Sequence, residues 1–283
     1  MRNIKKIRPF WGGVLVGILA IFYMYNAIMV QHLQYKFKII GWGGTFNVAL
    51  IKGFPAYQLC FIVGIIMMFI LLYIRKSLYQ VSIYVPIALT IILSILGFLG
   101  AKLLYILENL KTVNIKETLI SFGGLSFYGA LLLIPIIFIA FSRITNIDYQ
   151  KILDYSAPAG LIMITFMRFG CFFKGCCAGI QLWINHNPVI IPTQLIECSF
   201  DLFLLNYILY AENKDKFNGR RYSIFLLIYG IYRFFIEFIR NTKPIFLNMS
   251  NGQIMSLITI VLAIIYNQFY CKNRNTNIKY ERE

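Results

Sequence analysis

The sequence predicts an all-α, polytopic membrane protein with about eight transmembrane helices and both termini in the cytoplasm. Of its 283 residues, 59% are hydrophobic and 13% are charged, a composition too apolar for a soluble domain. The apolar residues form runs of about 20, the length that an α-helix needs to cross a bilayer core. Lysine and arginine gather just outside these runs, a pattern that fixes the orientation of membrane proteins.

The first apolar run, residues 10–30, follows four basic residues and resembles the start of a signal peptide. No small-residue cleavage motif follows it, so we expect a retained helix, followed by an external segment at 31–52. Seven further spans are predicted at 55–74, 83–107, 120–142, 153–172, 193–211, 222–240 and 252–271. Three regions are expected: the added helix and external segment (1–50), a membrane core (51–271) and a basic cytoplasmic tail (272–283).

The basic residues are distributed unequally between the two sides of the membrane. With the N-terminus inside, 16 of the 27 lysines and arginines fall at cytoplasmic ends, 8 on the external side and 3 within spans. This bias supports cytoplasmic termini. The net charge of +16 would suggest nucleic acid in a soluble protein, but here it favours anionic membrane lipid, and no nucleic-acid partner is expected.

The stretch YGIYRFFIEFIR, Tyr229 to Arg240, carries three charges within a run long enough to span a bilayer. On a helix, Arg233, Glu237 and Arg240 would lie along one stripe and could pair. A charge at membrane depth costs at least about 2.5–3.5 kcal/mol, so the stripe indicates a bundle interior or a water-filled cavity. Two alternatives stay open: an ion pair that only locks helices together, and end residues that reach the interface.

The stretch MRFGCFFKGCCAG places Arg168 near the end of an apolar span, just before three cysteines. Arg168 offers a planar donor fork that suits phosphate oxygens, although an end residue reaching the interface is the alternative. The spacing of Cys171, Cys176 and Cys177 is not the C-x-x-C zinc type, and no second ligand pair follows. We therefore expect no metal. An external disulfide or packing thiols are favoured over a nucleophilic cysteine activated by neighbouring cations.

The stretch SFGGLSFYGA, which begins at Ser121, sets three glycines beside Ser126 and Tyr128 at the external edge of a helix. Glycine lets a backbone approach a ligand closely, and a helix N-terminus offers N–H groups to an anion such as a lipid phosphate. Tight contact between helices is the simpler explanation, and composition favours it.

The stretch IPTQLIE opens the sixth predicted span. Thr193 is expected as an N-cap, with Gln194 and Glu197 in the first turn, and capping alone explains these residues. The two histidines, His32 and His186, fall in predicted external segments. A buried His-centred triad is therefore not expected.

The order and spacing of these stretches resemble the prolipoprotein diacylglyceryl transferase family of bacterial inner membranes. GGLSFYG resembles the family's Gly-Gly-x-Ser-Phe-His-Gly segment, and RFGCFFKGCCAG resembles its Arg-x-Gly-Asn-Phe-x-Asn-Gly-Glu-x-x-Gly signature. PTQLIE is similar to Pro-Ser-Gln-Leu-Tyr-Glu, and YGIYRFFIEFIR to Tyr-Gly-x-x-Arg-Phe-x-x-Glu-Phe-x-Arg; NGQIMS and PAYQL also look like family segments. The resemblance covers about residues 50–270, and the family's seven-helix fold matches if the first helix is an addition.

The resemblance implies transfer of a diacylglyceryl group from phosphatidylglycerol to the lipobox cysteine thiol of a lipoprotein precursor, in a bacterial cell membrane and without a cofactor. Glycerol phosphate would be released, Arg168 and Arg233 would hold the phosphate, and Glu237 would orient Arg233. The implied catalytic and substrate-binding residues are Arg168, Arg233, Tyr128, Tyr57, Glu237, Arg240, Gly123, Gly124, Ser126, Lys102, Gln194 and Glu197.

The chain departs from the family at several of its motif positions. The departures are Tyr128 for histidine, Cys171 and Cys176 for asparagine and glutamate, Ile190-Ile191 for Arg-His, and Lys102 for arginine. A tyrosine with a pKa of about 10 is a poor general base at neutral pH, so Tyr128 and Tyr57 are expected to orient groups or donate hydrogen bonds. Two other functions stay open: an enzyme of the same fold with another acceptor or lipid, and a non-catalytic protein that binds or transports lipid.

Overall fold

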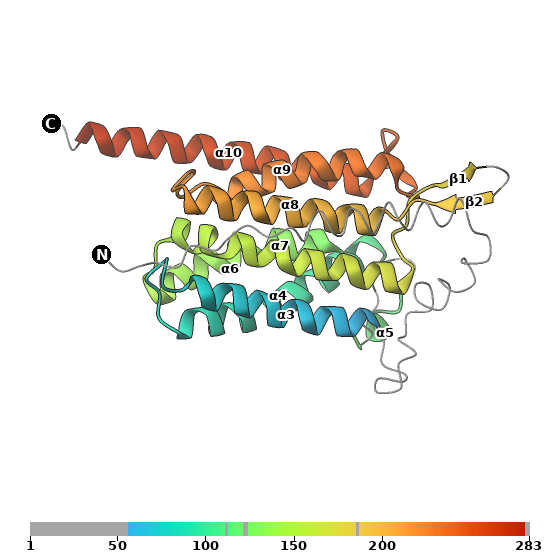
Figure 1. The fold of residues 1–283 in the computed structure, drawn as a ribbon, viewed down its shortest axis with the longest axis horizontal. Helices are drawn as coiled ribbons and strands as arrows, with labels where there is room; N and C mark the ends of the chain where they lie inside the picture. The colour runs from blue at the N-terminus through green and yellow to red at the C-terminus, as the bar shows by residue number, and fades with distance from the viewer. Residues whose placement is uncertain (1–55, 111–112, 121–123, 185–186, 281–283) are drawn as a thin grey trace. The chain divides into compact units, whose positions relative to one another are not determined.

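A computed structural model describes residues 56–280, except 111–112, 121–123 and 185–186. Each of the seven spans predicted between 55 and 271 corresponds to a helix in it (Figure 1). These helices are α3 (Ala56–Arg75), α4 (Tyr84–Glu108), α6 (Phe127–Thr145), α7 (Tyr149–Lys174), α8 (Thr193–Asn213), α9 (Arg221–Ile236) and α10 (Asn251–Tyr280). The predicted first helix, the external segment and both histidines lie outside the described residues.

Within the part of the chain that the structure describes, five helical segments are long and apolar enough to cross a membrane. They are Tyr57–Arg75, Tyr84–Glu108, Tyr128–Thr145, Tyr149–Lys174 and Arg221–Ile239. The prediction of a largely helical, polytopic membrane protein is thereby confirmed. Helix α8 is less apolar, because the carboxyl side chains of Glu197, Asp201 and Glu212 are buried along it.

The fourth predicted span, 120–142, begins too early. The chain instead forms a short helix α5 (Ile115–Ile120), and α6 begins only at Phe127. Between them, Gly124 has a φ of +63°, and a Cβ atom there would stand 2.5 Å from a ring carbon of Tyr105. Only glycine meets both conditions without strain, so this glycine ends the helical run.

The described residues form two compact units. The first contains residues 65–159, and the second contains residues 56–64 and those from 160 onward. Helices α3 and α7 therefore each pass from one unit into the other.

In the first unit, α4 and α6 pack together through two glycines. A Cβ atom at Gly129 would lie 2.1 Å from the carbonyl oxygen of Gly100, and one at Gly100 would lie 2.8 Å from the carbonyl oxygen of Gly129. Small residues let the two backbones approach this closely. The simpler explanation of the glycine-rich stretch, tight helix contact, is confirmed for Gly129.

Arg75, the last residue of α3, is buried. Only 1% of it is exposed. Its guanidinium donates to the carbonyl oxygens of Asp154 and Tyr155 and lies over the rings of Tyr79 and Tyr155, 5.1 and 5.5 Å from their centroids. Backbone acceptors and aromatic faces thus satisfy this cation inside the unit.

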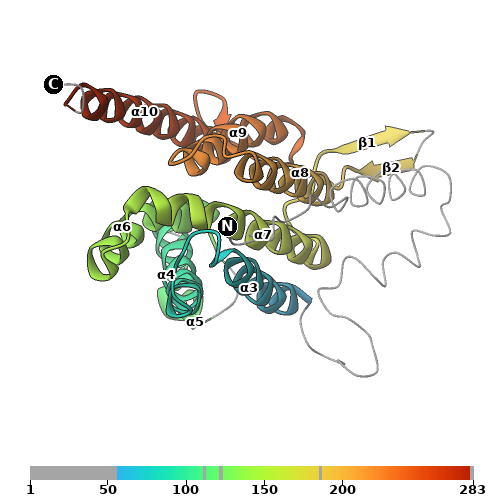
Figure 2. The same cartoon turned by 60° about the vertical axis from the view of Figure 1, so that its left-hand side comes forward.

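In the second unit, α9 packs against both α8 and α10, and the three helices run side by side in both views (Figures 1 and 2). Two short antiparallel hairpins, which the sequence analysis did not predict, precede two of these helices. β1 (Gln181–Ile184) and β2 (Asn187–Ile190) lead into α8, and β3 (Pro244–Phe246) and β4 (Met249–Ser250) lead into α10. The hairpins fix where α8 and α10 begin, and the site described next is built at these two helix starts.

Candidate active site

Arg168 in α7 and Glu197 in α8 form a buried ion pair. The Nε atom of Arg168 lies 2.7 Å from Oε2 of Glu197, with 10% and 2% of the two side chains exposed. Among the described residues, Glu197 is the one ion-pair partner of Arg168. Because Glu197 binds the Nε edge, the terminal nitrogens of the guanidinium remain available to a second, bidentate anion.

A second arginine is held in a similar way at the end of α9. Nη1 of Arg233 lies 2.6 Å from Oε2 of Glu237, and Nη1 of Arg240 lies 3.4 Å from the same oxygen. The other carboxylate oxygen, Oε1, accepts a hydrogen bond of 3.0 Å from the hydroxyl of Ser250. Glu237 therefore connects Arg233 and Arg240 to the start of α10.

The prediction that these charges lie on one helical stripe is only partly right. Helix α9 ends at Ile236, Glu237–Ile239 form one turn of 3₁₀ helix (η1), and Arg240 is extended with a φ of −88° and a ψ of 146°. The change of backbone still lets Arg240 reach Glu237. It also pairs the backbone of Arg240 with Gly179, so the charged cluster is tied to the end of the signature stretch.

The start of α10 fixes the position of the Glu237 carboxylate. The Ser250 hydroxyl accepts a hydrogen bond from the Gln253 N–H, and the Gln253 side chain accepts one from the Ser250 N–H. This reciprocal pair is a capping box. Next to it, a Cβ atom at Gly252 would stand 2.7 Å from both the carboxyl carbon and Oε1 of Glu237. Glycine is therefore required for the carboxylate to lie against the first turn of the helix.

The three cysteines come together because of how α7 ends. Gly175 has a φ of +72°, its N–H donates to the Phe172 carbonyl, and the N–H of Cys176 donates to the carbonyl of Cys171. This is a Schellman motif. In this motif the side chains of the two residues joined by the hydrogen bond that spans more residues approach each other. Those residues are Cys171 and Cys176. The five-residue spacing in the sequence is thus explained by a helix end.

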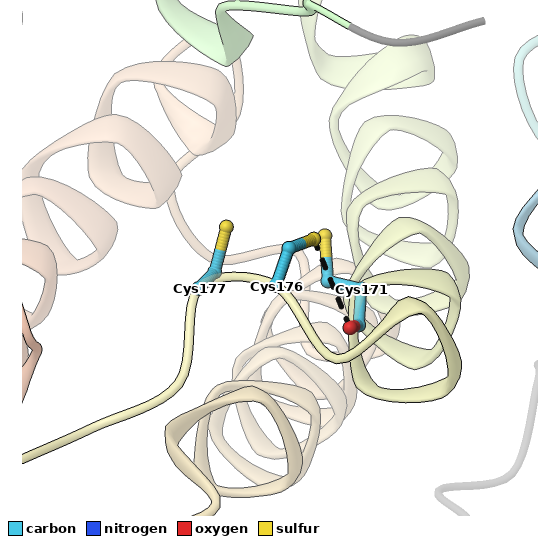
Figure 3. Close-up of side chains that lie close together, drawn as sticks. All are labelled: Cys171, Cys176 and Cys177. Atoms are coloured by element: carbon cyan, nitrogen blue, oxygen red, sulfur yellow. Dashed lines mark hydrogen bonds between the residues drawn. The ribbon is translucent and has the colours of Figure 1, made fainter. Parts of the chain in front are cut away.

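Cys177 follows with a φ of +64°, and its thiol joins the other two. The three sulfur atoms all lie within 4.8 Å of one another (Figure 3). Cys171 is buried, Cys176 is half-buried and Cys177 is exposed, and these three, Cys60 and Cys198 are free thiols. The cysteine spacing lacks the paired C-x-x-C pattern, but the turn at the end of α7 still brings three thiols to one point.

The electrostatic surroundings of Cys177 favour its thiolate. Hydrogen bonds from the thiols of Cys171 and Cys176 lower the pKa of Cys177, and the positive charges of Arg168 and Arg233 lower it further. Arg168 and Arg233 therefore both lie within electrostatic range of Cys177.

The first residues of α8 hold the cysteine turn in place. The hydroxyl of Thr193 donates to the carbonyl of Cys177 over 2.9 Å, and Nε2 of Gln194 donates to the carbonyl of Cys176 over 2.6 Å. Thr193 is not an N-cap, because Pro192 occupies that position, and Glu197 lies beyond the first turn. Capping alone, the explanation reached from the sequence, is wrong: these side chains support the cysteine turn and Arg168.

Gly179 joins the three segments of the site. Its N–H donates to the Ile191 carbonyl, and a Cβ atom there would lie 2.8 Å from both Cβ of Ile191 and the carbonyl oxygen of Ile239. The end of the signature stretch, the start of α8 and the end of η1 thus meet where only glycine fits. The contacts of Gly179 therefore link the segment that follows Arg168 to the segment that follows Arg233.

Tyr57, at the start of α3, also belongs to this part of the site. A Cβ atom at Gly170 would lie 3.0 Å from Cδ2 of Tyr57, so the tyrosine packs against the signature glycine. Its phenol is within electrostatic range of the three cysteines and of Arg168. The ammonium of Lys174 lies 5.2 Å from the centre of its ring.

Asp201 is a buried carboxyl that the sequence analysis did not single out. It lies four residues after Glu197, on the same face of α8, and is 1% exposed. Among the described residues, neither of its oxygens has a hydrogen-bond partner, and Oε1 of Glu197 has none either. An aspartate one helical turn from a predicted site glutamate, within an apolar span, was the signal that could have identified it.

The remaining predicted residues lie in the first unit. Lys102 is 1% exposed and donates over 2.6 Å to the carbonyl of Thr118. Tyr128 is buried in the first turn of α6, and the hydroxyl of Ser126 donates over 3.3 Å to Oε1 of Glu108. Gly124 contacts Tyr105, as described above, and Gly123 lies outside the described residues. The contacts of Lys102, Ser126 and Gly124 lie within this unit.

Comparisons with known proteins identify a family for this chain. The family described as prolipoprotein diacylglyceryl transferase matches residues 47–268. A phosphatidylglycerol–prolipoprotein diacylglyceryl transferase of Clostridium tetani is 33% identical over 183 residues, which cover 59% of this chain and 74% of the relative. The corresponding transferase 2 of Clostridium perfringens is 31% identical over 65% and 79% of the two chains. That of Clostridium novyi is 26% identical over 74% and 88%.

Proposed function

The chain belongs to the prolipoprotein diacylglyceryl transferase family, and we propose that it transfers a diacylglyceryl group from phosphatidylglycerol to the lipobox cysteine thiol of a lipoprotein precursor. The observation that carries the proposal is the presence of two buried arginines, Arg168 and Arg233, each held by one carboxylate. The names of the relatives supply the lipid and the class of acceptor.

The proposed reaction is a displacement at carbon. The acceptor sulfur forms a bond to the terminal glycerol carbon of the diacylglyceryl group, and the bond from that carbon to the phosphate oxygen breaks. The electron pair of the broken bond leaves with glycerol phosphate, and the thiol proton passes to a base or to solvent. Because the acceptor supplies the sulfur, the enzyme needs no nucleophile of its own.

The two arginines suit the phosphate, which gains negative charge as its bond to carbon breaks. A guanidinium presents a planar fork that can bind two phosphate oxygens at once. Donors that are already oriented lower the barrier most, because no reorganisation is needed when the charge develops. Glu197 and Glu237 supply this orientation to Arg168 and Arg233, and they limit the positive charge buried with them.

The other predicted residues are assigned supporting roles. Gln194 and Glu197 position the signature turn and Arg168, and Arg240 shares Glu237 with Arg233. Tyr57 is proposed to donate a hydrogen bond near the cysteines. For Tyr128, Lys102, Ser126, Gly123 and Gly124 we propose contact with the lipid, on the grounds of their motif positions.

The protein is proposed to lie in a bacterial cytoplasmic membrane. It would have eight transmembrane helices and both termini inside, with residues 1–50 added to a transferase core at 51–271 and a basic tail at 272–283. The charge bias between the two sides supports this topology. A reporter fused to the N-terminus should map to the cytoplasm, and an external location would contradict the topology.

The test of the function is a transfer assay on the purified full chain. A peptide that contains a lipobox cysteine is incubated with the protein and phosphatidylglycerol vesicles, and the product is analysed by mass spectrometry. We expect a thioether-linked diacylglyceryl adduct, which Arg168→Ala should abolish and which the control Arg143→Ala, at the exposed end of α6, should leave unchanged. No adduct from folded, lipid-bound protein would reject the proposed function.

A further inference from the structure

The three thiols of Cys171, Cys176 and Cys177 have the separation that a single metal ion requires. Their sulfur atoms lie within 4.8 Å of one another (Figure 3). Zinc binds thiolate sulfur at about 2.3 Å, so three such ligands around one ion stand about 3.8–4.0 Å apart. Small rotamer adjustments therefore suffice to bring the three sulfurs onto one ion.

The backbone of the cluster is fixed by interactions that do not involve the sulfur atoms. The Schellman motif at Gly175 sets Cys171 against Cys176, and Thr193 and Gln194 bind the carbonyls of Cys177 and Cys176. A site whose ligands are oriented by surrounding hydrogen bonds binds metal more tightly than a flexible one. The exposure of Cys177 gives an ion a path of entry.

Charge also favours a metal at this point. Three thiolates and one Zn²⁺ carry a net charge of −1, and a fourth thiolate would make it −2. Arg168 and Arg233 lie within electrostatic range of Cys177 and offset this charge. The same cations that suit a phosphate therefore also stabilise an anionic zinc–thiolate centre.

Three protein ligands leave one position of a tetrahedral zinc ion open. Structural zinc sites have four protein ligands, whereas catalytic sites keep a position for water or substrate. Within the described residues no fourth cysteine, histidine or carboxylate joins the group. The proposed reaction alkylates a thiol, and a thiol bound to zinc loses its proton.

We propose that Cys171, Cys176 and Cys177 bind Zn²⁺ and that its fourth position takes the acceptor cysteine of the lipoprotein precursor as a thiolate. The acceptor thiol displaces a zinc-bound water or hydroxide, and its proton leaves with that ligand or to solvent. A sulfur lone pair then attacks the glycerol carbon, and the electron pair of the C–O bond leaves with the phosphate. This inference rests on the proposed function, and it assigns the step that activates the acceptor.

The metal site is tested on the full chain, purified in detergent under reducing conditions and treated with a chelator. Zn²⁺ alone is added, and bound metal is measured by elemental analysis and by competition with a coloured chelator. We expect one Zn²⁺ per chain. Cys171→Ser, Cys176→Ser and Cys177→Ser should each weaken binding by more than about tenfold, whereas Cys60→Ser, a control outside the cluster, should not. Binding that is absent, or unchanged in all three variants, would overturn the proposal.

The open position is tested with Co²⁺ in place of Zn²⁺, because its absorption spectrum reports the number of sulfur ligands. A lipobox peptide should change this spectrum, and the same peptide with serine in place of cysteine should not. Oxidation of the trio to a disulfide, detected by mass spectrometry as the native state, would overturn the proposal. So would a spectrum that is identical with both peptides.

The transfer assay separates this proposal from the proposed function. Chelator-treated protein should lose transfer by at least about 10²-fold and should regain it with Zn²⁺. Full transfer without metal would leave the function standing and reject the zinc step. Metal binding with a peptide-dependent spectrum but no transfer in any condition would keep the site and reject the function.

Discussion

The carboxylate of Glu237 lies directly against the backbone of Gly252, so that a Cβ atom at residue 252 would stand 2.7 Å from the carboxyl carbon. A side chain at residue 252 would therefore clash unless either the helix start or the carboxylate moved. The helix start cannot move easily, because the capping box of Ser250 and Gln253 fixes it. The movable group is the carboxylate, and its displacement would release Arg233.

We therefore expect Gly252→Ala to reduce transfer by about 10-fold to 10²-fold, since a misplaced donor loses much of its effect on the transition state. The matched control is Gly160→Ala in α7, where nothing lies within 4 Å of an added Cβ atom. The rate of adduct formation and the unfolding temperature are measured for both. Unchanged transfer in Gly252→Ala would show that Glu237 does not need this position.

Lysine substitutions test whether the arginines act through their shape or only through their charge. Arg168→Lys and Arg233→Lys keep a cation but lose the planar fork, so we expect transfer to fall by about 10²-fold or more in each. The control is Arg143→Lys at the exposed end of α6, which should behave like the wild type. Full activity in both site variants would reject bidentate phosphate binding.

The pairing of Arg168 with Glu197 makes a prediction about stability. Removing one partner leaves an unpaired buried charge and costs about 3–5 kcal/mol, whereas replacing both by apolar residues is often neutral. Glu197→Leu should lower the free energy of unfolding in detergent, and the double variant Arg168→Met, Glu197→Leu should recover most of the loss. Additive losses would mean that the two side chains do not interact as a pair.

The glycine contact between α4 and α6 is tested by the free energy of unfolding in detergent. Gly129→Ala would place a Cβ atom 2.1 Å from the carbonyl oxygen of Gly100, and the two helices would have to separate. We expect a loss of a few kcal/mol, about the cost of overpacking a core. Gly97→Ala is the control, because its nearest new contact is an ordinary 3.9 Å to Ala130. Equal stability of the two variants would contradict the close approach.

The helices could be predicted from the sequence because apolar runs and their flanking charges report on the bilayer. The predicted limits of α3 and α4, 55–74 and 83–107, differ from the observed ones by a single residue at each end. The start of α6 was missed because a left-handed glycine, Gly124, breaks the run without any change in hydropathy. The 3₁₀ turn at Glu237 was missed for a similar reason, since its residues remain apolar and regularly spaced.

The sequence motifs predicted most of the site residues, but not which residues they contact in the fold. The pair Arg233 and Glu237 lies four residues apart, so local geometry was enough to predict it. The pair Arg168 and Glu197 joins two helices, and no local pattern reports which helices become neighbours. The cysteine trio depends on the Schellman motif, and the sequence signal for that motif is the glycine four residues after Cys171.

The pKa of Cys177 makes a prediction that does not depend on transfer. In metal-free protein, hydrogen bonds from Cys171 and Cys176 and the nearby arginines lower this pKa. A lowered pKa means that the reactive thiolate persists as the pH falls, so the rate of alkylation by iodoacetamide should reach half its maximum below about pH 8.5, the value of a free cysteine. Mass spectrometry of the peptide that contains Cys177 measures this rate.

Cys176→Ala removes one donor and should move the midpoint to higher pH, whereas Cys60→Ala should leave it in place. A wild-type midpoint at or above that of free cysteine would show that the thiols and arginines do not stabilise a thiolate at Cys177.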